Sequence, residues 1–120
     1  NFTDEKGENK LSLSSNSLIY IESADNYVEI NYVSQNKINK FLLRNSMKRM
    51  EEALVGTNVC RCHRSFIVNM EHVTAMRRNA DELEMEFRIP EIKKIPISKT
   101  YAEKVSEMFM HLAPKTSEEA

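Results

Sequence analysis

Residues 18–33 read LIYIESADNYVEINYV, which is two β-rich runs joined by the polar break Ala24–Asn26. In the second run, Val28, Ile30 and Tyr32 fall at every other position. Side chains on a strand alternate between its two faces, so this spacing places all three on one face. Two such runs separated by a short polar break predict an antiparallel hairpin.

Further short apolar runs, each bounded by polar or turn-forming residues, predict strands on both sides of this hairpin. They lie at Leu11–Leu13, Lys37–Leu43, Val59–Cys62, Phe66–Asn69, Val73–Met76 and Leu83–Phe87, and around Ile92–Ile97. Arg77–Asp81 is expected to form a hairpin loop. Pro96 indicates an edge strand or a strand end, because proline cannot donate a main-chain hydrogen bond to a neighbouring strand.

Two segments have helical spacing instead. Ser46 is predicted to cap a first helix that ends before Gly56. Ser98 is predicted to cap a last helix that runs to about His111, with apolar residues three or four apart. The sequence therefore predicts a mainly β fold with two short helices and antiparallel strands.

The length of 120 residues, with 41% hydrophobic and 29% charged residues, fits one globular domain. We expect residues 1–9 to be a linker or tail, 10–112 to be the domain, and 113–120 to be a C-terminal tail. Because the chain begins with Asn1, it is expected to be a piece of a longer protein. No apolar run approaches the ~20 residues that cross a bilayer, so we expect a cytoplasmic domain without membrane contact.

The net charge of -1 hides an uneven distribution. Residues 1–36 carry two basic and six acidic side chains, whereas residues 37–64 carry seven basic and two acidic ones. Steering of a polyanion depends on the local field, so the neutral total does not exclude a nucleic-acid partner. Charge alone is equally typical of a solvated surface.

No complete catalytic or metal-binding set is recognisable. Cys62 and His63 are neighbours on a predicted strand and point to opposite faces, which disfavours a nucleophile and base pair. Cys60 and Cys62 are one residue closer than zinc-site spacing requires, and no second pair exists. We therefore expect no enzyme activity, no metal and no cofactor, with both cysteines as reduced, core-facing residues.

The densest polar cluster, Arg61–Ser65 (RCHRS), fits a nucleic-acid-binding loop. A guanidinium such as that of Arg64 can donate two hydrogen bonds to guanine O6 and N7. Arg61, His63 and Ser65 can bind phosphate oxygens.

Two other segments can reach the same duplex. Lys99 lies with Ser98 and Thr100 at the start of the last helix, where free main-chain N–H groups can face a phosphate. Asn26 and Tyr27 lie in a turn between strands and can supply a third contact. Each residue taken singly is also typical of an ordinary surface.

Four segments in order resemble the LytTR family of bacterial DNA-binding domains. They are Ile19–Val28 (IYIESADNYV), Arg44–Leu54 (RNSMKRMEEAL), Arg61–Asn69 (RCHRSFIVN) and Ile95–Tyr101 (IPISKTY). The third is the most diagnostic, and the resemblance covers about Leu11 to His111.

The resemblance implies an elongated arrangement of small antiparallel sheets whose loops enter successive major grooves of paired direct repeats. It implies base contacts by Asn26, Tyr27, Arg64 and Lys99, and backbone contacts by Arg61, His63, Ser65, Ser98 and Thr100. Lys99 stands where the family often has arginine, and lysine lacks the planar fork, so base discrimination there is expected to be weaker. The resemblance also implies an upstream receiver or sensor domain, in a transcription regulator of a two-component system.

Two other functions remain open at this level. A protein-interaction β-module would pair through an exposed edge strand and, at a net charge of -1, would pass through a heparin column. A single-stranded RNA binder would need exposed stacking aromatics on a sheet. The chain has no Trp, and most of its other aromatics fall on predicted core faces, which disfavours the RNA binder.

Overall fold

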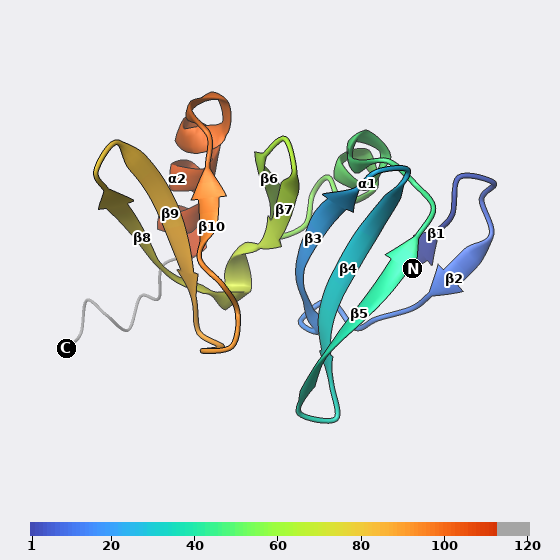
Figure 1. Cartoon of the computed structure of the whole chain (residues 1–120). Coiled ribbons are helices and arrows are strands. Elements are labelled where there is room, and N and C mark those ends of the chain that lie inside the picture. Colours follow the sequence, from blue (N-terminus) through green and yellow to red (C-terminus); the bar gives the residue numbers. More distant parts are fainter. Residues whose placement is uncertain (113–120) are drawn as a thin grey trace.

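The computed structural model describes residues 1–112, which form ten strands and two α-helices (Figure 1). The first five strands are β1 (Phe2–Thr3), β2 (Asn9–Leu11), β3 (Leu18–Ala24), β4 (Tyr27–Ser34) and β5 (Lys37–Leu43). The other five are β6 (Val59–His63), β7 (Phe66–Asn69), β8 (Val73–Asn79), β9 (Glu82–Phe87) and β10 (Ile95–Ile97). The helices are α1 (Met47–Ala53) and α2 (Lys99–Leu112), with a short 3₁₀ helix at Met70–His72. The expected C-terminal tail, 113–120, lies outside the described residues.

The strands form three antiparallel sheets. The largest has the order β5-β4-β3-β7-β6, the second has the order β10-β9-β8, and β1 pairs with β2. The molecule measures 46 × 32 × 26 Å along its principal axes. Figure 1 shows the sheets side by side along the longest dimension, so the predicted mainly β, elongated fold is confirmed.

Both faces of the five-stranded sheet are covered, and β3 supplies both cores. A register shift between Leu18 and Tyr20 marks a bulge in its pairing with β4. Strict alternation would place Ile19 and Ile21 on one face. Because of the bulge, Ile21 packs with Leu18 in one core while Ile19 packs with Tyr20 in the other.

The two cores contact different helices. One contains Met47 and Met50 of α1, and the other contains Val105 of α2. Ser46 caps α1 as predicted, because its hydroxyl oxygen accepts the main-chain N–H of Arg49 at 3.2 Å. Gly56 follows the helix with a φ of +87°, a conformation that glycine adopts without strain.

The N-terminal segment differs from the linker expected at residues 1–9. Phe2 is only 7% exposed and pairs with Leu11, so β1 and β2 form a hairpin on the core of the large sheet. The Asp4 carboxylate accepts the main-chain N–H groups of Lys6 and Glu8, each at 2.9 Å, and Gly7 has a φ of +85°. This turn chemistry and the burial of the Phe2 ring give the segment a defined structure. Its polar composition had predicted no regular structure there.

A second difference concerns the loop expected at Arg77–Asp81. Strand β8 continues to Asn79, which pairs with Glu82, and Arg77 pairs with Glu84. Only Ala80 and Asp81 remain outside the strands, and Ala80 takes a φ of +59°. The polar residues expected in the loop are therefore mostly part of strand β8, at the exposed end of the β8–β9 hairpin. Pro96 lies in β10, an edge strand of its sheet, as predicted.

Neither helix of residues 1–112 combines the length and the apolar character needed to cross a bilayer.

Candidate nucleic-acid interface

Three of the segments singled out in the sequence lie along one side of the molecule. They are the β3–β4 turn (Asp25–Tyr27), the β6–β7 turn (His63–Ser65) and the start of α2 (Ser98–Thr100), and together we call them the loop edge. In Figure 1 all three lie along the top of the molecule, whereas the β4–β5 hairpin projects from the opposite side. The fold thus gathers segments that are far apart in the sequence.

Main-chain hydrogen bonds fix these segments to one another. The N–H of Ser23, at the end of β3, donates to the carbonyl oxygen of Ser65 at 3.0 Å. The N–H of Ser98 donates to the carbonyl oxygen of Cys62 at 2.9 Å. The β6–β7 hairpin is therefore bonded through Ser65 to the strand that leads into Asn26, and through Cys62 to the start of α2.

The β6–β7 turn is held in a defined shape. The Nδ1 atom of His63 accepts the main-chain N–H of Ser65 at 3.1 Å. The His63 ring also packs edge-on against Phe66, with ring centroids 5.8 Å apart. Arg64 remains exposed at the tip. A rigid loop that presents a free guanidinium can donate to a base edge with little loss of conformational entropy.

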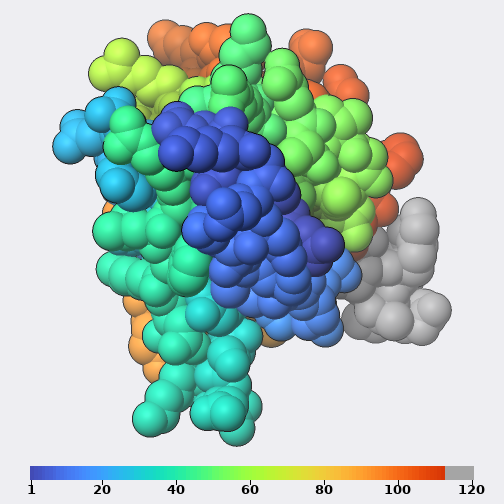
Figure 2. Space-filling view, turned by 90° about the vertical axis from the view of Figure 1, so that its right-hand side faces the viewer, coloured from blue at the N-terminus to red at the C-terminus, as the bar shows by residue number. Residues whose placement is uncertain are grey.

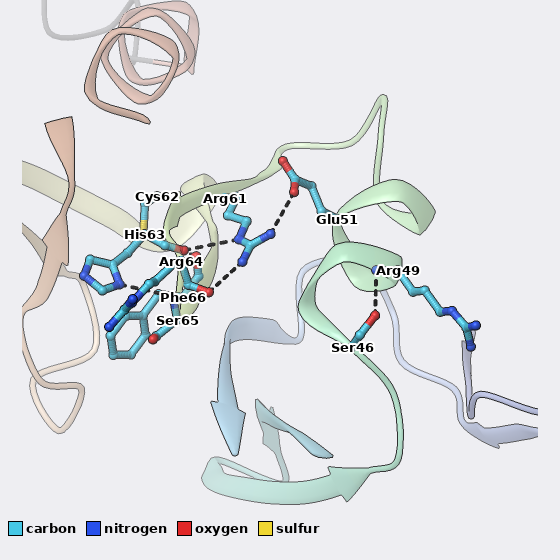
Figure 3. Close-up of polar contacts among 9 residues, drawn as sticks. All are labelled: Ser46, Arg49, Glu51, Arg61, Cys62, His63, Arg64, Ser65 and Phe66. Atoms are coloured by element: carbon cyan, nitrogen blue, oxygen red, sulfur yellow. Dashed lines mark hydrogen bonds and ion pairs between the residues drawn. The ribbon is translucent and has the colours of Figure 1, made fainter. Parts of the chain in front are cut away.

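The Arg61 side chain lies underneath this turn, and only 15% of its surface is exposed. Its Nη2 donates to the carbonyl oxygen of Arg64 at 2.6 Å, and its Nε donates to that of His63 at 3.3 Å. Its Nη1 pairs with Glu51 of α1 at 3.1 Å (Figure 3). The guanidinium carbon also lies 5.9 Å from the centre of the Tyr101 ring. These internal partners take three of the five guanidinium N–H groups. The phosphate contact expected of Arg61 stays a prediction.

The start of α2 shares a hollow with the β6–β7 turn. His63, Ser98 and Lys99 line this depression of about 280 Å³, together with Arg78 at the end of β8. Lys99 and Thr100 are exposed, whereas Ser98 is half-buried. Residues predicted separately, His63 and Lys99, thus lie around one hollow. Arg78 adds a positive charge there that the sequence did not predict.

The β3–β4 turn is more open. Asp25 has a φ of +57°, in the left-handed region that aspartate tolerates, and Asn26 is exposed. The Tyr27 side chain is 40% exposed, and its ring centre lies 5.6 Å from the guanidinium carbon of Arg44. Within residues 1–112, the side chain of Asn26 makes no hydrogen bond.

Cys60 and Cys62 face the core as predicted and are free thiols. Burial raises the pKa of Cys60 to about 11, and it raises the pKa of Cys62 above its ordinary range. A protonated, enclosed thiol is a poor nucleophile. Among residues 1–112, no group of His, Cys, Asp or Glu comes together as a metal-binding set.

Two further arginines, Arg44 and Arg49, line a hollow beside Asn26 and Tyr27, and the sequence did not predict this placement. Val28 pairs with Leu43 across β4 and β5, so Arg44, the next residue, lies opposite Tyr27. The N-terminal hairpin packs against Arg44. This contact was not predicted, because residues 1–9 were expected to be a linker. The turn signature Asp4 to Gly7 was the available signal for this hairpin.

The comparisons with known proteins agree with this architecture. The family model described as the LytTr DNA-binding domain matches residues 8–110. A solved LytTr DNA-binding domain, from a protein described as a methyl-accepting/DNA response regulator of Bacillus cereus, is similar in fold. It is 21% identical, with a TM-score of 0.61, over 82% of this chain and 85% of that one. No curated protein matches the chain.

Proposed function

Because the chain belongs to the LytTR family of DNA-binding domains, we propose that it recognises specific double-stranded DNA sequences through the loop edge. The observation that carries this proposal is the hydrogen bonding of the β6–β7 hairpin to both flanking segments, through Ser23 and Ser98. Three polar segments fixed side by side can follow a duplex over a distance that a single loop cannot span.

The proposed roles follow from side-chain chemistry. Arg64 reads a guanine through two hydrogen bonds, and Lys99 donates to a second base as a point charge. Asn26 and Tyr27 make the third base contact. The backbone contacts come from His63, Ser65, Ser98 and Thr100, and the last two are aided by the free N–H groups of the first turn of α2.

Arg61 has a different role in this proposal from the phosphate contact that the resemblance implies. Its guanidinium is enclosed by Glu51 and the carbonyl oxygens of His63 and Arg64. It therefore acts by holding the shape of the turn that presents Arg64.

At the level of the whole protein, we propose that this domain is the DNA-binding output half of a cytoplasmic transcription regulator in a two-component system. An upstream receiver or sensor domain would control it, and two copies would bind direct repeats. A single loop edge of this size offers few base contacts, so pairing of sites would supply the affinity that one copy lacks.

Selection of bound duplexes from a random pool tests the sequence specificity. We expect a recurring motif, present twice at a fixed spacing if two copies bind direct repeats. If about five phosphates are neutralised, the log–log slope of affinity against salt should be near -4.5. Binding without any recovered motif would leave a non-specific DNA-binding domain and overturn the proposed base readout.

A further inference from the structure

The β1–β2 hairpin is docked beside the β3–β4 turn by its main chain. The N–H of Glu5 donates to the carbonyl oxygen of Arg44 at 2.9 Å, and the side-chain amide of Asn45 donates to that of Thr3 at 2.8 Å. Figure 2 shows this N-terminal segment, in dark blue, lying against the green-teal residues that follow β5. The hairpin tip is therefore fixed next to the outer end of the loop edge.

Two arginines converge on this tip. The Nε atom of Arg44 lies 2.7 Å from the Glu5 carboxylate, and Nη1 of Arg49 donates to the Glu5 carbonyl oxygen at 3.3 Å. Figure 3 shows the Arg49 side chain pointing away from the Arg61 cluster. Both arginines line a hollow that also contains Asn26 and Tyr27. They are thus continuous with the segment proposed to contact DNA.

Arg44 and Arg49 are exposed to solvent, whereas the side chain of Arg61 is largely enclosed. The Arg44 side chain is 51% exposed and gives only its Nε to Glu5. A guanidinium has five N–H donors in a fork that matches a phosphate, and within residues 1–112 the Glu5 carboxylate takes one of them. An ion pair at such exposure contributes little net free energy and is easily exchanged for another anion.

We propose that Arg44 and Arg49 form a further phosphate-binding surface that extends the loop edge, and that the Glu5 carboxylate occupies it in the free protein. A duplex phosphate then displaces the carboxylate from Arg44. The inference rests on the proposed binding of DNA through the loop edge. It adds residues that the resemblance did not assign, and it gives the N-terminal hairpin a competitive role.

Removing the negative charge of Glu5 should strengthen DNA binding. Glu5→Gln keeps the main-chain bond to Arg44 and the size of the side chain, but it removes the charge that faces the guanidinium. The positive charge of Arg44 is then no longer offset by Glu5, so it neutralises a phosphate fully and the DNA releases up to one more condensed cation. We expect about three- to fivefold tighter binding at low salt and a salt slope steeper by up to about 0.9.

Removing the cation should have the opposite effect. Arg44→Gln should weaken binding by about threefold and make the salt slope shallower. The loss should be larger in the Glu5→Gln background, where Arg44 no longer has a competing partner. Arg49→Gln should act in the same direction. This non-additivity between residues 5 and 44 would not arise from two independent changes of net charge.

The experiment measures binding of the full chain to a labelled duplex of random sequence at several salt concentrations, because phosphate contacts do not depend on sequence. Glu8→Gln is the matched control: it makes the same charge change on the same hairpin, where Glu8 pairs with Lys10 at 2.9 Å. Arg88→Gln is the control for loss of a cation, since Arg88 follows β9 away from the loop edge. Thermal melting verifies that each variant is folded.

Two results would overturn the inference while leaving the proposed function standing. One is that Glu5→Gln and Glu8→Gln tighten binding equally, which would indicate only a long-range field. The other is that Arg44→Gln and Arg88→Gln weaken it equally. If wild type and all variants fail to bind any duplex, both the inference and the proposed function are wrong.

Discussion

The β6–β7 turn and the β3–β4 turn belong to the same loop edge but are built differently. The β6–β7 turn rests on the guanidinium of Arg61, which donates to two of its carbonyl oxygens, and on the ring of His63, which accepts from Ser65. In the β3–β4 turn, Asn26 makes no side-chain hydrogen bond within residues 1–112, and Tyr27 contacts the guanidinium of Arg44, whose side chain is exposed.

The difference separates two ways of contacting a duplex. A preorganised turn loses little conformational entropy on binding, so its contacts convert efficiently into affinity and discrimination. In the β3–β4 turn the pairing of Ala24 with Tyr27 fixes the main chain, but the exposed side chains must be ordered by the DNA, at a cost of roughly 0.5–1.5 kcal/mol for each. We therefore expect base discrimination to be concentrated at Arg64, and the β3–β4 turn to adapt to different sequences.

Arg61→Ala should have the largest effect, because it removes the support of the β6–β7 turn. It leaves Glu51 and the carbonyl oxygens of His63 and Arg64 without their partner, at a cost of about 2–3 kcal/mol in the free energy of unfolding. Thermal melting should show a fall in Tm of about 10 °C. Selection on random duplexes should show a weakened motif.

Arg61→Lys sharpens this test, since lysine keeps the charge beside Glu51 but cannot reach both carbonyl oxygens. We expect it to restore part of the stability and little of the base preference. A variant that instead stayed fully stable and lost affinity equally on all duplexes, with a shallower salt slope, would show that Arg61 contacts phosphate as the resemblance implied.

Arg64→Ala should leave the fold unchanged, because its side chain is exposed, yet it should cost roughly 1–3 kcal/mol on the selected duplex. The measurement is the ratio of affinities for the selected duplex and a scrambled one. Arg88→Ala serves as the control for loss of an exposed arginine. Equal loss on both duplexes would contradict base reading and remove the distinction between the two turns.

The contrast between the turns was only partly predictable. Alternation in Tyr27–Val33 and the break at Ala24–Asn26 predicted the β3–β4 hairpin, because strand spacing and turn residues are local signals. The same alternation places Arg61 on the side opposite Cys60 and Cys62, which suggests solvent. No local signal indicates that Glu51 of α1 covers that side, since this contact depends on how two distant elements pack.

The N-terminal hairpin was expected to be an unstructured linker, but it is ordered. Its overall composition is typical of a linker. A single residue, Phe2, attaches it to the core, and a composition average does not reveal one such residue. The bulge in β3 is a similar case, because a strict period of two cannot predict the residue at which a strand changes face. The three segments of the loop edge were identified from their side-chain chemistry and from the resemblance, whereas their mutual hydrogen bonding required coordinates.

Alkaline pH should lower the free energy of unfolding, because the thiol of Cys60 is buried. Burial raises the pKa of Cys60 from its ordinary value of 9.0 to about 11, so the folded state keeps a proton that the unfolded chain releases. The stabilisation from the buried thiol is therefore complete below pH 9.0 and is lost as the pH rises towards about 11. Urea unfolding at pH values on either side of 9.0 measures this loss, which should be shallower in Cys60→Ala. Rapid labelling of both thiols in the native protein at neutral pH would contradict their enclosure.

Asn26→Ala should have the smallest effect, because the β3–β4 turn is open. Its exposed amide has no hydrogen-bond partner within residues 1–112, so the free energy of unfolding should change by less than about 0.5 kcal/mol. On the selected duplex we expect a loss of about threefold, since the contact offsets the cost of ordering the turn. Tyr27→Phe, which keeps the ring beside Arg44, should lose less still. If Asn26→Ala cost more than Arg64→Ala, the open turn would carry the base reading, and rigidity in the free protein would not determine where this domain discriminates between sequences.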